Sequence, residues 1–340
     1  MKDSNFLIIK YSSLGDIINS IPAVRILRKA RPDSRIHWLI KEPFAGLLKY
    51  SDFLDSVIVY GKGGGLAGTM DALGAIRKLG ITTVFDLQGL LKSSLIGYFS
   101  GAKERVSLPN TREGSFLFHT RKLGIPRKTK GVHAVEENAA VIEDYAGLKR
   151  GSAQYDFSFT IPAEAAARAT GLIGAGSGPV VAVSPTTRWK SKLFQPKKFA
   201  EVADRLTKEC GARIFFTGTK GDIEYVNATI AFMQMPCVSL AGKTDLITLA
   251  AVLKASNLLL SCDSGTMHLG SAVGTPLVAV FGPTDPSYIG PYSKKSKAIT
   301  ASIECAPCRK RECEPLKCMD AVSVDEVFTS AREMLTLKSS

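Results

Sequence analysis

The chain has 340 residues, 45% of them hydrophobic and 22% charged, and this length and balance predict two globular domains. No apolar run approaches the roughly 18 residues that span a bilayer, which excludes an integral membrane protein and favours a cytoplasmic location. The net charge of +13 indicates an acidic partner, such as nucleic acid, an anionic membrane surface or a phosphorylated substrate. Because no nucleic-acid motif accompanies the scattered basic residues, the last two partners are favoured.

The first half of the chain alternates predicted strands with predicted helices. The apolar run from Asn5 to Lys10 is typical of a strand buried on both faces of a parallel sheet, and a helix is predicted from Ile17 to Ala30. Further strand and helix pairs are predicted at 35–40 and 44–50, at 56–60 and 66–79, and at 81–86 and 91–98, with a glycine-rich loop at 62–65 and a long helix at 132–148. This alternation predicts a doubly wound parallel sheet.

A second alternation begins at Val180, after a stretch rich in Ala and Gly at 161–179 that predicts an inter-domain connection. Strands are predicted at 180–183, 213–217, 236–239, 257–261 and 276–281, and helices at 196–209, 222–232, 244–255 and 266–272. The pattern therefore predicts an α/β protein with two Rossmann-like doubly wound domains, residues 1–160 and 180–323, facing each other across a cleft.

Asp16 follows the first strand, at the end of the run Tyr11-Ser12-Ser13-Leu14-Gly15-Asp16 and at the start of a predicted helix. The commonest role of Asp at a helix start is to cap it. The alternative is a carboxylate at the carboxyl edge of the sheet that acts as a general base. The residues alone leave both interpretations open.

Two polar turns of the second domain are candidates for binding a nucleotide. Thr186 and Thr187 precede the cations of the run Arg188-Trp189-Lys190-Ser191-Lys192, so hydroxyls and ammonium groups could hold a diphosphate, or the run could be a solvated basic loop. In the next turn, Asp222 or Glu224 could accept hydrogen bonds from ribose hydroxyls, although acidic residues are common at helix starts in any case.

The segment Cys262–Pro286 contains a strand, a polar turn and a short helix, followed by a second strand and a second polar turn. Unpaired backbone N–H groups at Ser264, Gly265 and Thr266 are suited to a diphosphate at a helix N-terminus. The alternative is an ordinary βαβ unit in which Asp263 or Ser264 caps the helix and His268 is a satisfied core histidine.

Four cysteines lie close together near the end of the sequence: Cys305, Cys308, Cys313 and Cys318. Four thiols at this spacing could bind Zn²⁺ or an iron–sulfur cluster as a structural site. The alternative is a loop of reduced thiols, because a cytoplasmic chain does not normally keep disulfides.

Four segments together resemble the glycosyltransferase family 9 heptosyltransferases, in the same order and over nearly the whole chain: Tyr11–Ile17, Thr186–Phe194, Asp263–Leu269 and Phe281–Pro286. Phe194 departs from the family pattern, which more often has Trp there. The resemblance implies a GT-B fold, with the acceptor bound by residues 1–160 and the sugar nucleotide by residues 180–323. It also implies that the last helix, within 324–340, packs back on the first domain.

The resemblance also implies roles for individual residues. Asp16 would be the catalytic base, with the acceptor-side loop formed by Ser12, Ser13 and Gly15. Thr186, Thr187 and Lys192 would hold the donor diphosphate, with Lys190 as a competing candidate for the lysine. Asp263 and the backbone of Ser264, Gly265 and Thr266 would contact the donor sugar and phosphates. The predicted donor-side set is completed by Asp222, Glu224 and His268.

The function implied is an inverting transfer of heptose from ADP-heptose to the lipid-anchored core oligosaccharide of lipopolysaccharide. The enzyme would work at the inner face of the cytoplasmic membrane, in contact with anionic lipid, without nucleic acid and without a required cofactor. The sequence has no D-x-D metal-binding motif, so catalysis is expected to be metal-independent. The alternatives are a family relative that transfers another sugar, such as N-acetylglucosamine, and a nucleotide-binding or metal-binding regulatory protein without catalytic activity.

Overall fold

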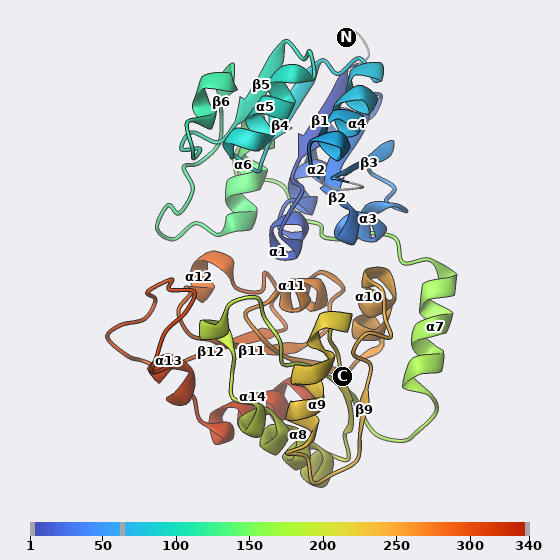
Figure 1. Ribbon diagram of the computed structural model, residues 1–340, viewed down its shortest axis with the longest axis vertical. Coiled ribbons are helices and arrows are strands. Elements are labelled where there is room, and N and C mark those ends of the chain that lie inside the picture. The colour runs from blue at the N-terminus through green and yellow to red at the C-terminus, as the bar shows by residue number, and fades with distance from the viewer. Residues whose placement is uncertain (1–3, 62–64, 337–340) are drawn as a thin grey trace. The chain divides into compact units, whose positions relative to one another are not determined.

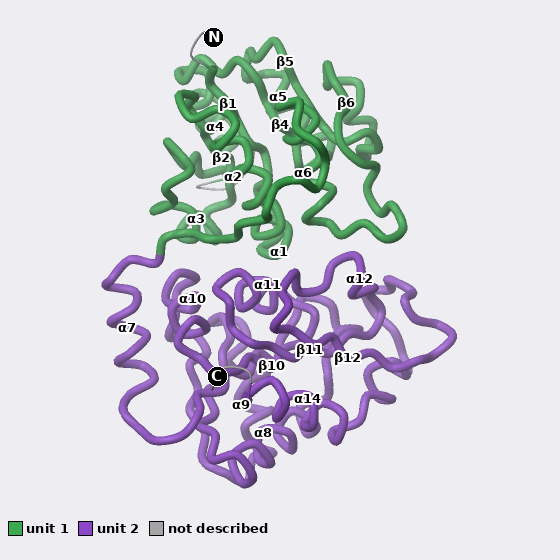
Figure 2. Tube along the Cα trace, turned by 180° about the vertical axis from the view of Figure 1, so that it is seen from behind, with its two compact units in different colours: residues 1–160 green, residues 161–340 purple. Residues whose placement is uncertain are grey.

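The computed structural model describes residues 4–61 and 65–336. The glycine-rich loop predicted at 62–65 lies, apart from Gly65, outside this description. The chain divides into two compact units, residues 1–160 and 161–340, and each unit is built on its own six-stranded parallel sheet (Figure 2).

The first unit has the strand order β3-β2-β1-β4-β5-β6, and all of its neighbouring strands are parallel (Figure 1). Its strands are β1 Asn5–Ile9, β2 Arg35–Lys41, β3 Ser56–Tyr60, β4 Thr83–Asp86, β5 Glu104–Ser107 and β6 Arg121–Lys122. Its helices are α1 Leu14–Ile18, α2 Ile21–Ala30, α3 Glu42–Leu48, α4 Gly65–Lys78, α5 Leu91–Phe99, the short 3₁₀ helix η1 Ser115–Phe118 and α6 Ala134–Ala146.

Helices cover both faces of this first sheet, and strand β1 lies at its centre. Leu7 and Ile9 of β1 share one core cluster with Ile76 of α4. On the other face, the ring of Phe6 packs edge-on against Tyr145 of α6 at a centroid separation of 5.9 Å. Because successive side chains of a strand point to opposite faces, a strand with two covered faces needs a continuous apolar run. The observed core confirms the interpretation of 5–10 as a doubly buried strand.

The helix predicted from Ile17 to Ala30 is two helices in the structure. Asn19 and Ser20 separate α1 from α2, and Pro22 lies in the first turn of α2. Proline has no N–H, and its ring clashes with the carbonyl four residues earlier in a continuous helix, so the chain restarts the helix there. As a result Asp16 belongs to a helix of only five residues.

The second unit has the strand order β12-β11-β10-β7-β8-β9, again with all neighbours parallel. Its strands are β7 Val180–Ser184, β8 Arg213–Phe216, β9 Cys237–Ser239, β10 Leu258–Cys262, β11 Leu277–Phe281 and β12 Ser296–Thr300. Its helices are α7 Ala163–Ile173, η2 Lys190–Lys192, α8 Pro196–Cys210, η3 Lys220–Asp222, α9 Ile223–Ile230, α10 Leu246–Ala255, α11 Gly265–Ala272, α12 Pro286–Ile289, α13 Lys317–Asp320 and α14 Val324–Thr336.

Two expectations for the second unit change. The connection predicted at 161–179 contains helix α7, which packs against α10. The last helix was expected to pack back on the first domain, whereas the structure shows its buried face packed within the second unit. Val327 and Phe328 of α14 are buried in the core of the second unit, and Arg205 of α8 pairs with Asp325 at 2.6 Å. The apolar stripe of α14 is therefore used within its own unit.

Both sheets have the same topology, in which the strand order reverses next to the first strand of the unit. The reversal lies between β1 and β4 in the first sheet and between β7 and β10 in the second. Ligands of open α/β sheets bind outside the carboxyl ends of the strands at such a switch point. The segments that follow these four strands, beginning at residues 10, 87, 185 and 263, are therefore where a site is expected in each unit.

Candidate active site

Asp16 lies at the switch point of the first sheet, on the short helix α1 that follows β1. Its Oδ2 atom accepts hydrogen bonds from the backbone N–H and the hydroxyl of Ser13, at 3.0 and 2.6 Å. The carboxylate therefore closes a capping box from position N3 of α1, and Ser13, not Asp16 as the first interpretation had it, is the N-cap residue. Its side chain is still 51% exposed, so the carboxylate is accessible from solvent within the first unit.

The structure adds a residue to this edge that the sequence analysis missed. Lys10 is buried, and its Nζ atom donates a hydrogen bond to the carbonyl of Leu87 at 2.8 Å. The same Nζ atom lies 3.9 Å from Oδ1 of Asp16. Arg127 donates to the Leu87 carbonyl as well, at 2.7 Å, so two cations lie beside the carboxylate.

The surroundings of Asp16 and Lys10 shift the pKa of both side chains. Desolvation pushes the pKa of Asp16 upward, but the Lys10 charge and the two Ser13 hydrogen bonds outweigh it and hold the pKa below the usual value. Burial lowers the pKa of Lys10 to about 8, against the attraction of Asp16. At neutral pH the Asp16 carboxylate is therefore ionised and able to accept a proton.

A second carboxylate at this edge, that of Asp86, is buried and structural. Asp86, at the end of β4, accepts hydrogen bonds from the N–H groups of Gln88 and Gly89 and from the Ser93 hydroxyl, and it contacts Nε2 of His119 at 3.0 Å. It therefore holds the turn after β4. Within that turn, Oε1 of Gln88 accepts from the Ser12 N–H at 3.4 Å, which links the turn to the acceptor-side loop.

The switch point of the second sheet holds a buried ion pair. Nζ of Lys192 lies 2.5 Å from Oδ2 of Asp263, and both side chains are almost fully buried. Thr284, in the turn after β11, donates its hydroxyl to the same Oδ2 at 2.5 Å. Thr187 donates to the Asp263 main-chain carbonyl at 3.1 Å. Three turns are thus joined around one carboxylate.

The other predicted donor-side residues lie on the turns and helices that follow β7, β8 and β10, and they differ in burial. Ser264 caps α11, with its hydroxyl accepting from the Met267 N–H at 3.4 Å, and Gly265 and Thr266 form the first turn of that helix. His268 is buried further along α11, and Thr186 is half-buried in the turn after β7. Asp222 and Glu224 lie after the neighbouring strand β8. Asp222 accepts from the N–H and the hydroxyl of Thr219, and Glu224 is exposed.

The two candidate lysines of the turn after β7 differ sharply. Lys192 is buried and paired with Asp263, whereas the Lys190 side chain is 81% exposed and pairs at 3.8 Å with the exposed Glu312. A surface pair of this kind contributes little to stability or binding. The geometry therefore favours Lys192 as the lysine of the site.

The cysteine-rich segment contacts this same turn. The N–H and hydroxyl of Ser191 donate to the carbonyls of Arg311 and Lys310, at 3.2 and 2.6 Å. Cys305 and Cys308 are exposed and Cys318 is buried. Among the residues that the structure describes, no group of three or more His, Cys, Asp or Glu is arranged to hold a metal ion.

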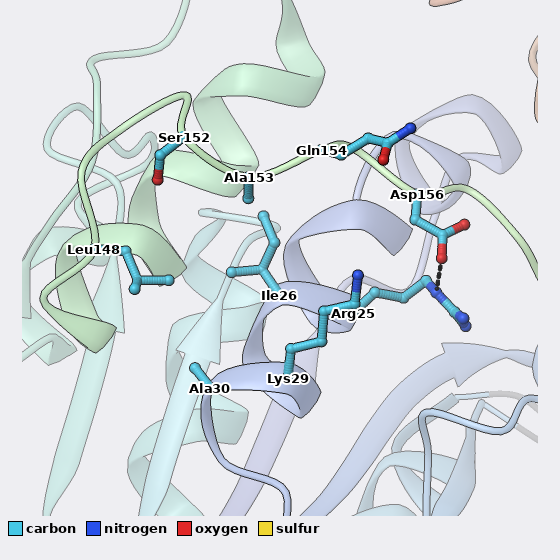
Figure 3. Close-up of a pocket in the computed structure, with 9 residues that line it drawn as sticks. All are labelled: Arg25, Ile26, Lys29, Ala30, Leu148, Ser152, Ala153, Gln154 and Asp156. Carbon is cyan, nitrogen blue, oxygen red and sulfur yellow. Dashed lines mark hydrogen bonds and ion pairs between the residues drawn. The ribbon is translucent and has the colours of Figure 1, made fainter.

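A pocket of about 320 Å³ lies in the first unit between α2 and the segment 148–156 (Figure 3). None of the predicted site residues lines it. Arg25 points into this region, but its guanidinium is already paired with Asp156 at 2.7 Å and Asp52 at 2.8 Å. The charge of Arg25 is therefore balanced by carboxylates of its own unit, and Lys29 is the other cation that lines the pocket. Within residues 4–61 and 65–336, no helix has both the length and the apolar character needed to cross a membrane.

Sequence reasoning missed Lys10 and the role of Thr284. A signal for Lys10 exists, since a charged residue that ends a doubly buried strand needs partners inside the protein. Thr284 lies in the segment Phe281–Pro286, but nothing in that segment indicates that its hydroxyl reaches Asp263. Both contacts join residues that are distant in the chain.

Two Rossmann-like parallel sheets, each with polar turns at its switch point, are the architecture of the GT-B fold, and solved structures of family 9 glycosyltransferases share it. A glycosyltransferase family 9 structure from Veillonella parvula has a TM-score of 0.85 at 24% identity, covering 98% of this chain and 97% of that one. The Escherichia coli heptosyltransferase WaaC with ADP has a TM-score of 0.75 at 22% identity, covering 97% and 99%.

The sequence comparisons agree with the fold. Lipopolysaccharide heptosyltransferase 1 of Pseudomonas aeruginosa is 25% identical over 326 residues, covering 90% of this chain and 86% of the relative. Residues 73–319 match the family model of Glycosyltransferase family 9 (heptosyltransferase). The chain belongs to glycosyltransferase family 9. This confirms the resemblance noted in the sequence and the GT-B fold that it implied.

Proposed function

We propose that the protein is an inverting, metal-independent heptosyltransferase that moves heptose from ADP-heptose to the inner core of lipopolysaccharide. The observation that carries the proposal is the Asp16 carboxylate, kept ionised by Lys10 and Ser13 at the switch point of the first sheet. In the second unit, Lys192 and the first turn of α11 supply positive charge at the corresponding edge.

The proposed reaction uses these groups in one displacement. Asp16 takes the proton of the acceptor hydroxyl as the hydroxyl oxygen attacks the anomeric carbon of the donor. The bond between that carbon and the diphosphate oxygen breaks, and ADP leaves with the bonding electrons. Lys192, the Thr186 and Thr187 hydroxyls and the N–H groups of the α11 N-terminus would stabilise the charge on the departing diphosphate.

We propose that the reaction needs no metal ion, because protein groups can stabilise the diphosphate instead. A divalent cation in a sugar transfer serves to neutralise the diphosphate. In this protein a lysine and a helix N-terminus are available for that task. We propose that Asp263 and His268 contact the donor sugar and that Asp222 or Glu224 contacts the ribose hydroxyls.

The identity of the substrates rests on the relatives. The P. aeruginosa protein is named a lipopolysaccharide heptosyltransferase, and the WaaC structure contains ADP. We propose that the second unit binds ADP-heptose and that the first binds a lipid-anchored core oligosaccharide. The enzyme would then act in the cytoplasm, peripheral to the inner face of the cytoplasmic membrane, where its net charge of +13 meets anionic lipid and phosphorylated acceptor.

The nucleotide is tested by thermal unfolding with ADP, UDP and GDP at matched concentrations. A ligand at 100 times its dissociation constant adds roughly 2.7 kcal/mol to the native state, so the specific nucleotide should raise the melting temperature measurably. We expect a shift with ADP and a much smaller one with UDP or GDP. A shift with UDP or GDP alone would mean a donor other than ADP-heptose, and no shift with any of them would contradict catalysis.

A second test concerns Lys10. In Lys10→Met the positive charge beside Asp16 is gone while desolvation remains, so the pKa of Asp16 should rise. A base must be ionised to act, so the acid limb of the pH profile of kcat/KM should move to higher pH. The Leu87 carbonyl keeps its hydrogen bond from Arg127, which limits structural damage.

The matched control for this test is Lys29→Met, on α2, away from Asp16. It should leave the pH profile unchanged, and Lys10→Arg, which keeps the charge, should restore the acid limb toward the wild-type position. If Lys10→Met lowers activity equally at every pH, Lys10 acts only through structure and not through the ionisation of Asp16.

A further inference from the structure

Exposed apolar side chains are concentrated in one region of the first unit. Tyr98 and Phe99 end helix α5, and Phe116 and Leu117 lie in η1. Each of these side chains is about half exposed or more, up to 73% for Leu117. Helix α5 packs against η1, and the ring of Tyr98 lies 5.6 Å from that of Phe118. These four residues therefore lie on two elements that contact each other, and we call them the aromatic patch; helix α5 is labelled in Figure 1.

Cations contact rings of the aromatic patch, and the segment that carries it is basic. From Lys92 to Lys130 the sequence contains nine Lys and Arg residues and only two Glu. The Arg105 guanidinium lies over the Tyr98 ring at 5.4 Å, and the Lys122 ammonium lies over the Phe116 ring at 5.4 Å. Both glutamates have partners inside the unit, since Glu104 pairs with Arg121 and Glu113 accepts from a backbone N–H. The patch therefore combines exposed apolar side chains with ring-contacting cations, on a segment whose nine basic and two acidic residues give a net charge of +7.

We propose that the aromatic patch and its surrounding lysines and arginines dock the protein on an anionic lipid bilayer. Aromatic rings are favoured at the level of lipid headgroups, and each Lys or Arg near an anionic membrane surface strengthens binding. A protein partner fits less well, because lysine is depleted in protein interfaces relative to the rest of the surface. The charge of the patch thus selects the lipid surface as its partner.

The chain links the patch to the catalytic edge. The segment that leaves α5 passes Arg112, whose N–H donates to the Gly89 carbonyl at 3.1 Å. It continues through η1 to Arg127, which shares the Leu87 carbonyl with Lys10. One segment therefore carries both the patch and a cation beside Asp16. This arrangement suits an acceptor that stays anchored in the bilayer, and to that extent the inference rests on the proposed function.

The test is cosedimentation of the full-length protein with vesicles of phosphatidylcholine alone or mixed with phosphatidylglycerol. Wild-type protein should bind the anionic vesicles, bind phosphatidylcholine weakly, and be released by salt. The double variant Phe116→Ser, Leu117→Ser should bind the anionic vesicles at least tenfold more weakly. Removing two charges in Arg121→Gln, Lys122→Gln should weaken binding by about 25-fold, at about fivefold for each cation.

Matched controls lie in the second unit. Phe232 is as exposed as Phe116, at 49% against 48%, so Phe232→Ser should bind as the wild type does. The exposed pair Lys197 and Lys208 provides the charge control when both are changed to Gln. Equal binding by patch and control variants, or no binding of the wild type to anionic vesicles, would overturn the inference. If the wild type is a dimer and the patch variants are monomers, the patch mediates self-association, and the inference is likewise overturned.

The vesicle assay contains neither donor nor acceptor, so its result does not depend on the sugar that is transferred. With a water-soluble, delipidated acceptor, the patch variants should turn over at the wild-type rate. Weak vesicle binding with normal turnover in solution supports a docking surface. Loss of turnover with the soluble acceptor would overturn it in favour of a role for the patch in acceptor binding.

Discussion

Replacing Asp16 with Asn should lower the rate of sugar transfer by about 10²–10⁴-fold, the usual contribution of a general base. The amide cannot take the acceptor proton, but its carbonyl oxygen can still accept the hydrogen bonds that Ser13 donates to Oδ2. Helix α1 should therefore keep its cap. Single-turnover measurements with saturating donor and acceptor would separate the loss of chemistry from a loss of binding.

Two controls accompany this variant: a substitution in the first unit and a measurement of ADP binding, which is proposed for the second. Asp71→Asn changes an exposed carboxylate on α4 and should leave transfer unaffected. The thermal shift with ADP should be the same in Asp16→Asn as in the wild type, because the proposed nucleotide contacts all belong to the second unit. Retention of more than about a tenth of the wild-type turnover by Asp16→Asn would rule out Asp16 as the base.

Replacing Lys192 with Ala should affect stability and catalysis together. It leaves the Asp263 carboxylate buried with Thr284 but without its cation, and breaking a buried pair in this way costs about 3–5 kcal/mol. For a unit of this size we expect the melting temperature to fall by roughly 10 °C. Turnover should fall by roughly 10²–10³-fold, as when one fixed donor to a developing charge is removed.

Two further variants distinguish the role of Lys192 in binding from its role in packing. Lys190→Ala removes the exposed neighbour and should change neither property. Asp263→Asn also breaks the buried ion pair, but it releases Lys192 and removes a negative charge near the proposed diphosphate, so binding of ADP should be kept or strengthened. If both Lys192→Ala and Asp263→Asn abolish the ADP shift to the same degree, Lys192 supports the fold and does not contact the nucleotide.

Much of the fold is readable from local patterns because the strands are buried on both faces. The run from Phe6 to Ile9 has no polar residue, and only a covered parallel strand requires that. Strands β5 and β6 were not predicted because they are short and polar, and β6 consists of Arg121 and Lys122 alone. Their pairing with neighbours, not their composition, makes them strands.

Helix α14 shows the limit of such patterns. A helix was predicted within 324–340, and α14 is Val324–Thr336, but the existence of a helix does not specify the surface that its apolar face covers. The site shows the same limit. Asp16, Lys192 and Asp263 stand in recognisable segments, whereas the contacts of Lys10 with Leu87 and of Thr284 with Asp263 depend on how distant turns meet.

The carboxylate of Asp16 has two tasks in the proposed mechanism. Oδ2 closes the first turn of α1 by accepting from the N–H and hydroxyl of Ser13, and its carboxylate is the proposed proton acceptor. Once a proton arrives, these bonds lose their charge-assisted strength. If Asp16 is the base, the loop that carries Ser12 and Ser13 would therefore be held more tightly before transfer than after it. Product formation would itself loosen the acceptor side, and restoring the ionised base would tighten it for the next cycle.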